Sequence, residues 1–187
     1  MRVILRCFAA ACLVLYSLSA LGDDNRQSNT FLMFNAGTLT INIMQLQINN
    51  PFDPNDDSVE PIGVIDEKAF GTFGRADMKT IAKVTGEVPQ PEECPDGFPI
   101  PLVVTDDARV LTFRDLSQLV GHGRTVVCVE PGGTQGVRGD GQWSSGTRRF
   151  ADVIGGEFQI SSTATPQSTN GQFYSTVGSI SGRLERQ

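Results

Sequence analysis

The chain has 187 residues, a formal net charge of −6, 39% hydrophobic residues and 7% aromatic residues. This length suits a single domain. The acidic balance disfavours binding to nucleic acids and attraction to an anionic membrane surface, because like charges repel. The 20 glycines are typical of an all-β protein with many tight turns.

The first 22 residues have the order of a secretory signal segment. Arg2 and Arg6 give a positive start, an apolar run follows over residues 7–21, and residues 20–22 fit a small-x-small cleavage site. The run is shorter than the roughly 20 apolar residues that a membrane span needs. We therefore predict a cleaved signal and an exported protein, secreted or held in a periplasm or at a cell surface, with no stable membrane insertion. Two alternatives stay open, an uncleaved anchor and lipidation at Cys12.

Signal cleavage would leave an even pair of cysteines, Cys94 and Cys128. It would also remove two arginines and no acid, which changes the formal charge from −6 to −8. In an oxidising compartment such a pair is typical of a disulfide. Two cysteines and one histidine cannot complete a tetrahedral zinc site without carboxylates. We predict a Cys94–Cys128 disulfide and no cofactor.

A polar N-terminal arm is predicted over residues 23–35, followed by a single β domain over residues 36–187. Leu39, Ile41 and Ile43 alternate with polar residues, and the alternation then slips by one position. A one-residue slip within a strand predicts a β-bulge.

An acidic loop is predicted over residues 49–61. Asp53, Asn55 and Asp57 place oxygen ligands at alternate positions, as at the start of a calcium loop, and Glu60 could add another. The glycine and the glutamate that an EF-hand needs further on are replaced by serine and valine. The alternative is a solvated acidic loop without a metal.

Strand patterns continue through the middle of the chain. Over residues 77–84, Met78, Thr80, Ala82 and Val84 share one face, which predicts a half-exposed antiparallel strand. The five prolines within residues 88–101 predict an extended loop, because proline cannot donate to a β-ladder.

Two interpretations compete over residues 106–120. Val110, Phe113, Leu116 and Val120 match the stripe of an amphipathic helix. The same residues also fit a hairpin with its turn at Arg114-Asp115, and this is the interpretation we favour.

A strand over residues 124–130 has apolar side chains on both faces, Val126 and Cys128 on one and Val127 and Val129 on the other. Such a strand belongs in the centre of a sheet or in a barrel wall. Gly178 predicts a bulge between two late strands at 173–177 and 179–185. With eight to ten short strands, we predict a small antiparallel β-barrel, since closure removes exposed edges, and keep a β-sandwich as the alternative.

Glycine-rich motifs occupy the last third of the chain. Residues 146–151 (GTRRFA), 155–158 (GGEF) and 178–182 (GSISG) resemble the G-T-G-R-F-x-x-A-x-G…G-x-I pattern of small exported barrels related to allene oxide cyclase and dirigent proteins. Arg148 stands where that pattern has glycine. The resemblance implies a barrel. The family includes cyclases, stereo-directing proteins and members without known activity, and none of its catalytic residues maps onto this chain.

Three carboxylates, Glu130, Glu157 and Asp66, lie in or beside predicted strands. A carboxylate that points into a barrel is desolvated, and its raised pKa would suit acid or base chemistry. The alternative is a place on the rim or surface. His122 is the only histidine, so any nucleophilic triad would need it, yet no G-x-S-x-G elbow accompanies it. A loop histidine is the simpler interpretation.

Five aromatic residues could line an apolar cavity or simply form the core: Trp143, Phe150, Phe158, Phe173 and Tyr174. Small barrels often hold one ligand. Our leading hypothesis is therefore an exported barrel, not an enzyme, that binds a small apolar or amphiphilic molecule. The alternatives are an isomerase or cyclase acting on an apolar substrate, as the resemblance implies, and a structural or surface-interaction protein.

Overall fold

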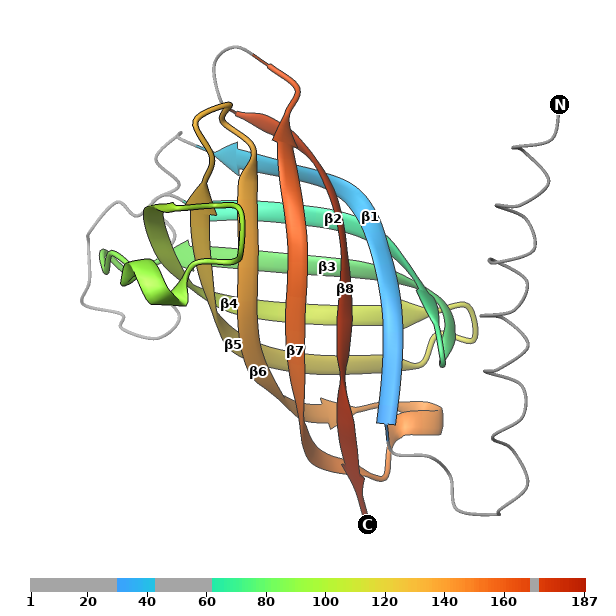
Figure 1. Cartoon of the computed structure of the whole chain (residues 1–187). Coiled ribbons are helices and arrows are strands. Elements are labelled where there is room, and N and C mark those ends of the chain that lie inside the picture. The colour runs from blue at the N-terminus through green and yellow to red at the C-terminus, as the bar shows by residue number, and fades with distance from the viewer. Residues whose placement is uncertain (1–29, 43–61, 169–171) are drawn as a thin grey trace, which may run out of the picture.

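Eight antiparallel strands follow one another around a closed barrel in the computed structural model, which describes residues 30–42, 62–168 and 172–187 (Figure 1). Each strand pairs with its neighbour along the chain, and β8 closes the barrel against β1. This confirms the predicted all-β barrel and rules out the sandwich. The elements are β1 (Thr30–Asn42), β2 (Ile62–Gly71), β3 (Gly74–Val84), η1 (Pro91–Glu93), β4 (Ile100–Phe113), β5 (Gln118–Val129), β6 (Gln135–Gly146), η2 (Arg148–Phe150), β7 (Val153–Pro166) and β8 (Phe173–Arg186).

The first strand begins earlier than predicted. Residues 30–35 belong to β1, so the predicted polar arm is wrong over this stretch. Phe31 and Met33 alternate inward with exposed neighbours, and this part of β1 pairs with β8. The bulge predicted near Ile43 and the calcium-loop residues Asp53, Asn55, Asp57 and Glu60 lie outside the described residues.

The hairpin over residues 106–120 is confirmed, because β4 and β5 pair on either side of a turn at residues 114–117. The helical alternative is wrong, since Leu111 and Phe113 face inward together at a spacing of two. The bulge predicted at Gly178 is also wrong, because β8 runs through it without a register shift. A Cβ at Gly178 would collide with Ser162 on β7, so the glycine allows a close approach of the two strands.

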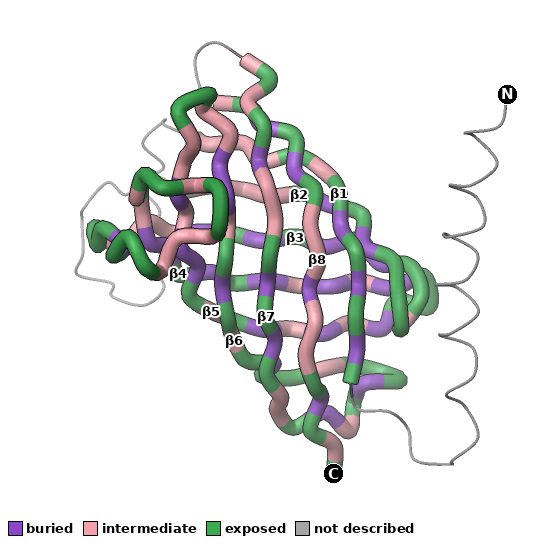
Figure 2. The backbone as a smooth tube through the Cα atoms, in the orientation of Figure 1, coloured by how far each residue is buried: buried purple, intermediate pink, exposed green. Residues whose placement is uncertain are grey.

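One end of the barrel is filled by aromatic rings packed in tilted and edge-to-face pairs, which we call the aromatic plug: Phe31, Phe73, Phe113, Trp143, Phe150 and Phe158. The ring centroids of Trp143 and Phe158 lie 4.7 Å apart. A Cβ at Gly121 would lie 2.8 Å from Cε3 of Trp143 and 2.9 Å from Cε1 of Phe158, so the glycine leaves the space that both rings use. Figure 2 shows the alternation of buried and exposed residues along the strands.

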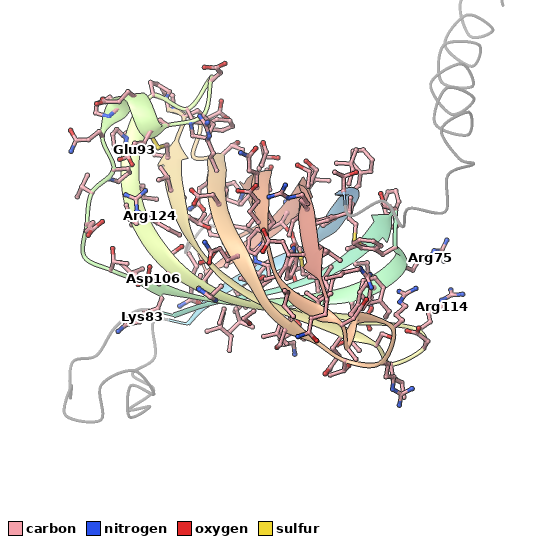
Figure 3. All side chains as sticks on the ribbon, turned by 90° about the horizontal axis from the view of Figure 1, so that it is seen from below. Arg75, Lys83, Glu93, Asp106, Arg114 and Arg124 are labelled. Atoms are coloured by element: carbon pink, nitrogen blue, oxygen red, sulfur yellow. A yellow bond between two sulfur atoms is a disulfide. The ribbon has the colours of Figure 1, made fainter. Side chains whose placement is uncertain are left out.

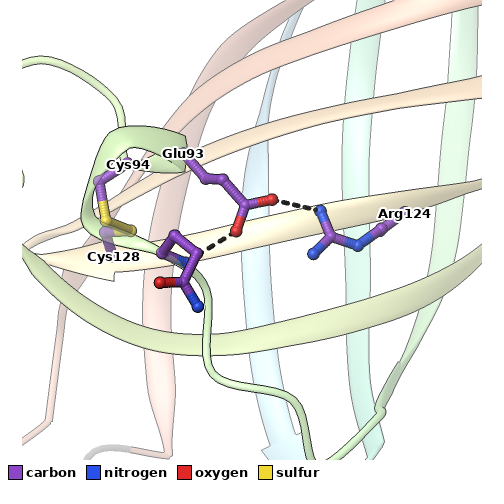
Figure 4. Close-up of a disulfide and its surroundings, with 5 residues drawn as sticks. Glu93, Cys94, Arg124 and Cys128 are labelled. Atoms are coloured by element: carbon purple, nitrogen blue, oxygen red, sulfur yellow. Dashed lines mark hydrogen bonds and ion pairs between the residues drawn. A yellow bond between two sulfur atoms is a disulfide. The ribbon is translucent and has the colours of Figure 1, made fainter.

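The connection between β3 and β4 folds back on the outside of the barrel (Figure 1). It is held by the predicted disulfide between Cys94 and Cys128 of β5 (Figure 4). Glu93 accepts a hydrogen bond from the backbone amide of Gln90 at 2.7 Å, which lowers the pKa of that carboxyl, and Arg124 at 3.1 Å adds to the effect. The connection covers the outer face of β5, so this strand has apolar side chains on both sides, as predicted.

Charged side chains lie at both ends of the barrel (Figure 3). Arg75 and Arg114 lie at the plugged end, whereas Lys83 and Asp106 lie towards the opposite end. Among the described residues, no helix is long and apolar enough to cross a membrane.

Candidate functional site

The barrel encloses a cavity of about 290 Å³ between the aromatic plug and the opposite end, and we call it the lumen. Its wall is aliphatic and comes from most of the strands: Leu39, Ile65, Val84, Val127, Val137 and Ile180. The volume corresponds to roughly ten water-sized groups. It lies near the lower end of the range for ligand pockets, which starts at about 300 Å³.

Polar side chains form the floor of the lumen next to the plug. Asp107 on β4 accepts hydrogen bonds from the hydroxyls of Thr105, at 2.8 Å, and Thr125, at 2.5 Å. It also pairs with Arg109, whose Nη2 lies 2.9 Å from Oδ2. The two charged side chains are only 3% and 4% exposed, so this ion pair is fully buried. The guanidinium of Arg109 lies over the ring of Phe158 of the plug, 5.3 Å from its centroid.

A second buried carboxylate, Glu67 on β2, lines the same cavity. Its Oε1 accepts hydrogen bonds from Nδ2 of Asn35 at 2.8 Å and from the hydroxyl of Thr176 at 2.6 Å. Gly37 lies opposite Glu67 in the β1–β2 register, and a Cβ there would lie 2.8 Å from Cγ of Glu67. The glycine therefore lets the Glu67 side chain extend along the inside of the wall.

Burial changes the ionisation of the ion pair. Desolvation raises the pKa of Asp107, and Arg109 and the two threonine hydroxyls oppose the shift. Desolvation lowers the pKa of Arg109, and the charges of Asp107 and Glu67 oppose it. An arginine keeps its charge in proteins. Asp107 is thus the group on the floor whose proton affinity the fold increases.

Two buried polar atoms of the floor have no hydrogen-bond partner among the described residues: Oδ1 of Asn35 and Nε of Arg109. Both side chains line the lumen, and both residues are 4% exposed. An unpaired buried polar group costs about 1–3 kcal/mol. The floor therefore offers one acceptor and one donor that a bound molecule could use.

The three carboxylates singled out from the sequence lie elsewhere. Asp66 points outward and pairs with Lys79 on the surface, and the Glu157 side chain is 73% exposed. Glu130 lies just after β5 in the turn before β6 and is absent from the lumen wall. None of them lines the cavity, and the carboxylates that do are Asp107 and Glu67, which were not singled out from the sequence. His122 is exposed on the outer face of β5.

The aromatic residues also have a different role from the predicted lining. Trp143, Phe150 and Phe158 belong to the aromatic plug, and Phe173 is 50% exposed on the outside. Tyr174 is buried but does not line the lumen. Aliphatic side chains take the lining role instead. Within the part of the chain that the structure describes, no three His, Cys, Asp or Glu residues come together to hold a metal ion.

Sequence reasoning missed the floor, although a signal was present. Thr105, Asp107 and Arg109 are separated from Leu111 and Phe113 by even numbers of residues, so all five lie on the same face of a strand. Leu111 and Phe113 are apolar, which indicates that this face is the buried one. In β2, Glu67 lies on the same strand face as Ile65 and Ala69, which are also apolar. The alternation therefore pointed inward for all three charged residues.

No protein-family model matches the chain, no curated protein matches it, and no solved structure matches it. The resemblance to the allene oxide cyclase and dirigent barrels stays a prediction. Arg148, at the position where that pattern has glycine, takes a left-handed backbone with φ of 54°. Such a conformation favours glycine.

Proposed function

We propose that the protein is an exported carrier that binds one small amphiphilic molecule in the lumen. The observation that supports this is an aliphatic cavity that ends on buried polar groups, two of which have atoms without a hydrogen-bond partner in the described part of the chain. Ligand sites combine apolar walls with a few placed polar groups in this way. The tail of the ligand would lie along Leu39, Ile65 and Val127, and its head would reach the floor.

The size of the lumen limits the ligand. A cavity of about 290 Å³ takes roughly ten water-sized groups, which suits an eight-carbon chain with one polar head. A two-tailed lipid would not fit inside. Export through the predicted signal segment is consistent with a carrier that works outside the cytoplasm.

Isothermal titration calorimetry of the mature protein with octan-1-ol, octylammonium and octanoate tests the proposal. We expect one-to-one binding of at least one probe. Ala82 lines the lumen, so Ala82→Phe should fill the cavity and weaken that binding at least tenfold. The matched control Ala108→Phe places the same ring on the exposed outer face of β4 and should bind like wild type. Binding of no probe, or equal binding by Ala82→Phe, would overturn the proposal.

A second candidate is an isomerase or cyclase on an apolar substrate, which the resemblance implies. The observation in its favour is Asp107, a carboxyl that is desolvated beside an open cavity and has a raised pKa. Such a group suits proton transfer. Nuclear magnetic resonance spectra of a bound natural ligand over time separate the two functions. An isomerase converts the ligand and loses this activity in Asp107→Asn, whereas a carrier returns it unchanged.

A further inference from the structure

We infer that the lumen selects a ligand with a cationic head group, such as a primary ammonium, over one with a neutral or anionic head. This rests on the proposed carrier function and adds the chemical class of the ligand. It starts from the charges of the floor. Among the described residues that line the lumen, the charged ones are Glu67, Asp107 and Arg109. The fixed charges thus sum to one negative charge when both carboxylates are ionised.

Arg109 forms its ion pair with Asp107. The pair is joined at 2.9 Å, and the other partners of Asp107 are the neutral hydroxyls of Thr105 and Thr125. The guanidinium also lies over the face of Phe158, which stabilises its charge. No ion pair within 4.0 Å joins Arg109 to Glu67 in the described part of the chain. The negative charge left over is therefore that of Glu67.

Among the described residues, the hydrogen-bond partners of Glu67 are neutral, and the charge of Arg109 acts on it without an ion-pair contact. Asn35 and Thr176 both donate to Oε1, and the Glu67 side chain lines the lumen, where a ligand head could meet its carboxylate. Near this carboxylate lies an acceptor with no partner among the described residues, Oδ1 of Asn35, a residue that is 4% exposed. An ammonium carries three donors and no acceptor, so it can satisfy acceptors of this kind and balance the charge.

The other head groups fit less well. A carboxylate could accept from Nε of Arg109, but it would bring a third negative charge into a cavity whose one arginine is already ion-paired with Asp107 through Nη2. An alcohol could donate to one acceptor but would leave the net negative charge of the floor unbalanced. The expected order of affinity is therefore ammonium, then alcohol, then carboxylate.

The three eight-carbon probes differ only in the head and give the test directly. At pH 7 and about 0.15 M salt, octylammonium should bind wild type at least tenfold more tightly than octan-1-ol, and octanoate should be weakest. Glu67→Gln keeps the shape and an acceptor for Asn35 and Thr176, and should reduce the preference for octylammonium to less than threefold. Asp66→Asn is the matched control, because it removes the neighbouring carboxylate of the same strand on the outer face. It should leave the order and its size unchanged.

Each outcome has one meaning. If octan-1-ol or octanoate binds wild type as tightly as octylammonium, the cationic head is refuted while the carrier function stands. If no probe binds, the carrier function itself fails. If Glu67→Gln keeps the full preference, Glu67 is not its source and the inference is overturned. Should Glu67→Gln not fold, the order of affinities in wild type still decides between the head groups.

Discussion

The buried ion pair of the floor should dominate the response of the fold to a single substitution. In Arg109→Met, Asp107 stays in the interior with two threonine hydroxyls as its remaining partners among the described residues. Removing one member of a buried pair costs about 3–5 kcal/mol, because the other charge is left uncompensated. The side chains of this pair are 4% and 3% exposed, so solvent screens little of that cost. We expect a loss in this range at pH 7.

Replacing both charges should restore much of the loss. The double variant Asp107→Leu/Arg109→Met puts apolar groups of similar volume into the same space, and such replacements are often neutral or stabilising. We expect its free energy of unfolding to stay within about 2 kcal/mol of wild type. The strength of the pair is the difference between the double variant and the sum of the single variants.

Urea unfolding followed by the fluorescence of Trp143 gives these energies, since it is the only tryptophan and lies buried in the plug. Additive effects of the two substitutions, or a loss below about 1 kcal/mol in Arg109→Met, would refute the reasoning. Either result would mean that water or a rearranged side chain compensates the charges on the floor.

Three further predictions concern pH, the disulfide and the plug. Burial raises the pKa of Asp107, so the native chain holds a proton there at pH values where the unfolded chain has released it. The free energy of unfolding should therefore fall as pH rises from about 4 through the native pKa. Urea titrations across pH 4–8 should show this decline in wild type and not in Asp107→Asn. The disulfide closes a loop with a sequence separation of 34, so Cys94→Ala/Cys128→Ala should lose about 3–4 kcal/mol of stability in the same assay; a loss below about 1 kcal/mol would contradict the loop-entropy argument. Gly121→Ala should lose about 1–3 kcal/mol by crowding the plug, whereas Gly132→Ala, whose nearest neighbour would be 3.5 Å away, should change stability by less than about 0.5 kcal/mol. Equal effects of the two glycine substitutions would count against the tight plug.

The strands with regular alternation were predictable from the sequence. Met78, Thr80 and Ala82 are buried on one face of β3, as their spacing of two indicates. The two apolar faces of β5 place it in the barrel wall, as predicted, whereas the β3–β4 connection that covers its outer face was not predicted. The start of β1 was not predictable in the same way, because Asn35 and Gly37 interrupt the apolar face. Gly37 leaves space for the Glu67 side chain, and Asn35 donates a hydrogen bond to it. Because Glu67 is on another strand, the local sequence of β1 does not show this requirement.

The site shows how strongly register decides function. Asp66 and Glu67 are consecutive in β2, so their side chains point to opposite faces of the strand. Asp66 forms a surface ion pair, whereas Glu67 is a carboxylate of the floor, and Asp66 is the one that was singled out from the sequence. Charge patterns in a sequence suggest the surface by default, because buried acids are rare. The hairpin interpretation places Asp107 and Arg109 on the buried face of β4, whereas the helical interpretation does not. The export signal and the family resemblance stay predictions.

The most direct test of the carrier function is a crystal structure of the mature protein grown with the tightest-binding of the three eight-carbon probes. We expect density for one molecule in the lumen, with its chain along Leu39, Ile65 and Val127 and its head within hydrogen-bonding distance of the floor at Glu67 or Asn35. A lumen that holds only water, with the probe absent or bound to the outer wall, would contradict the account.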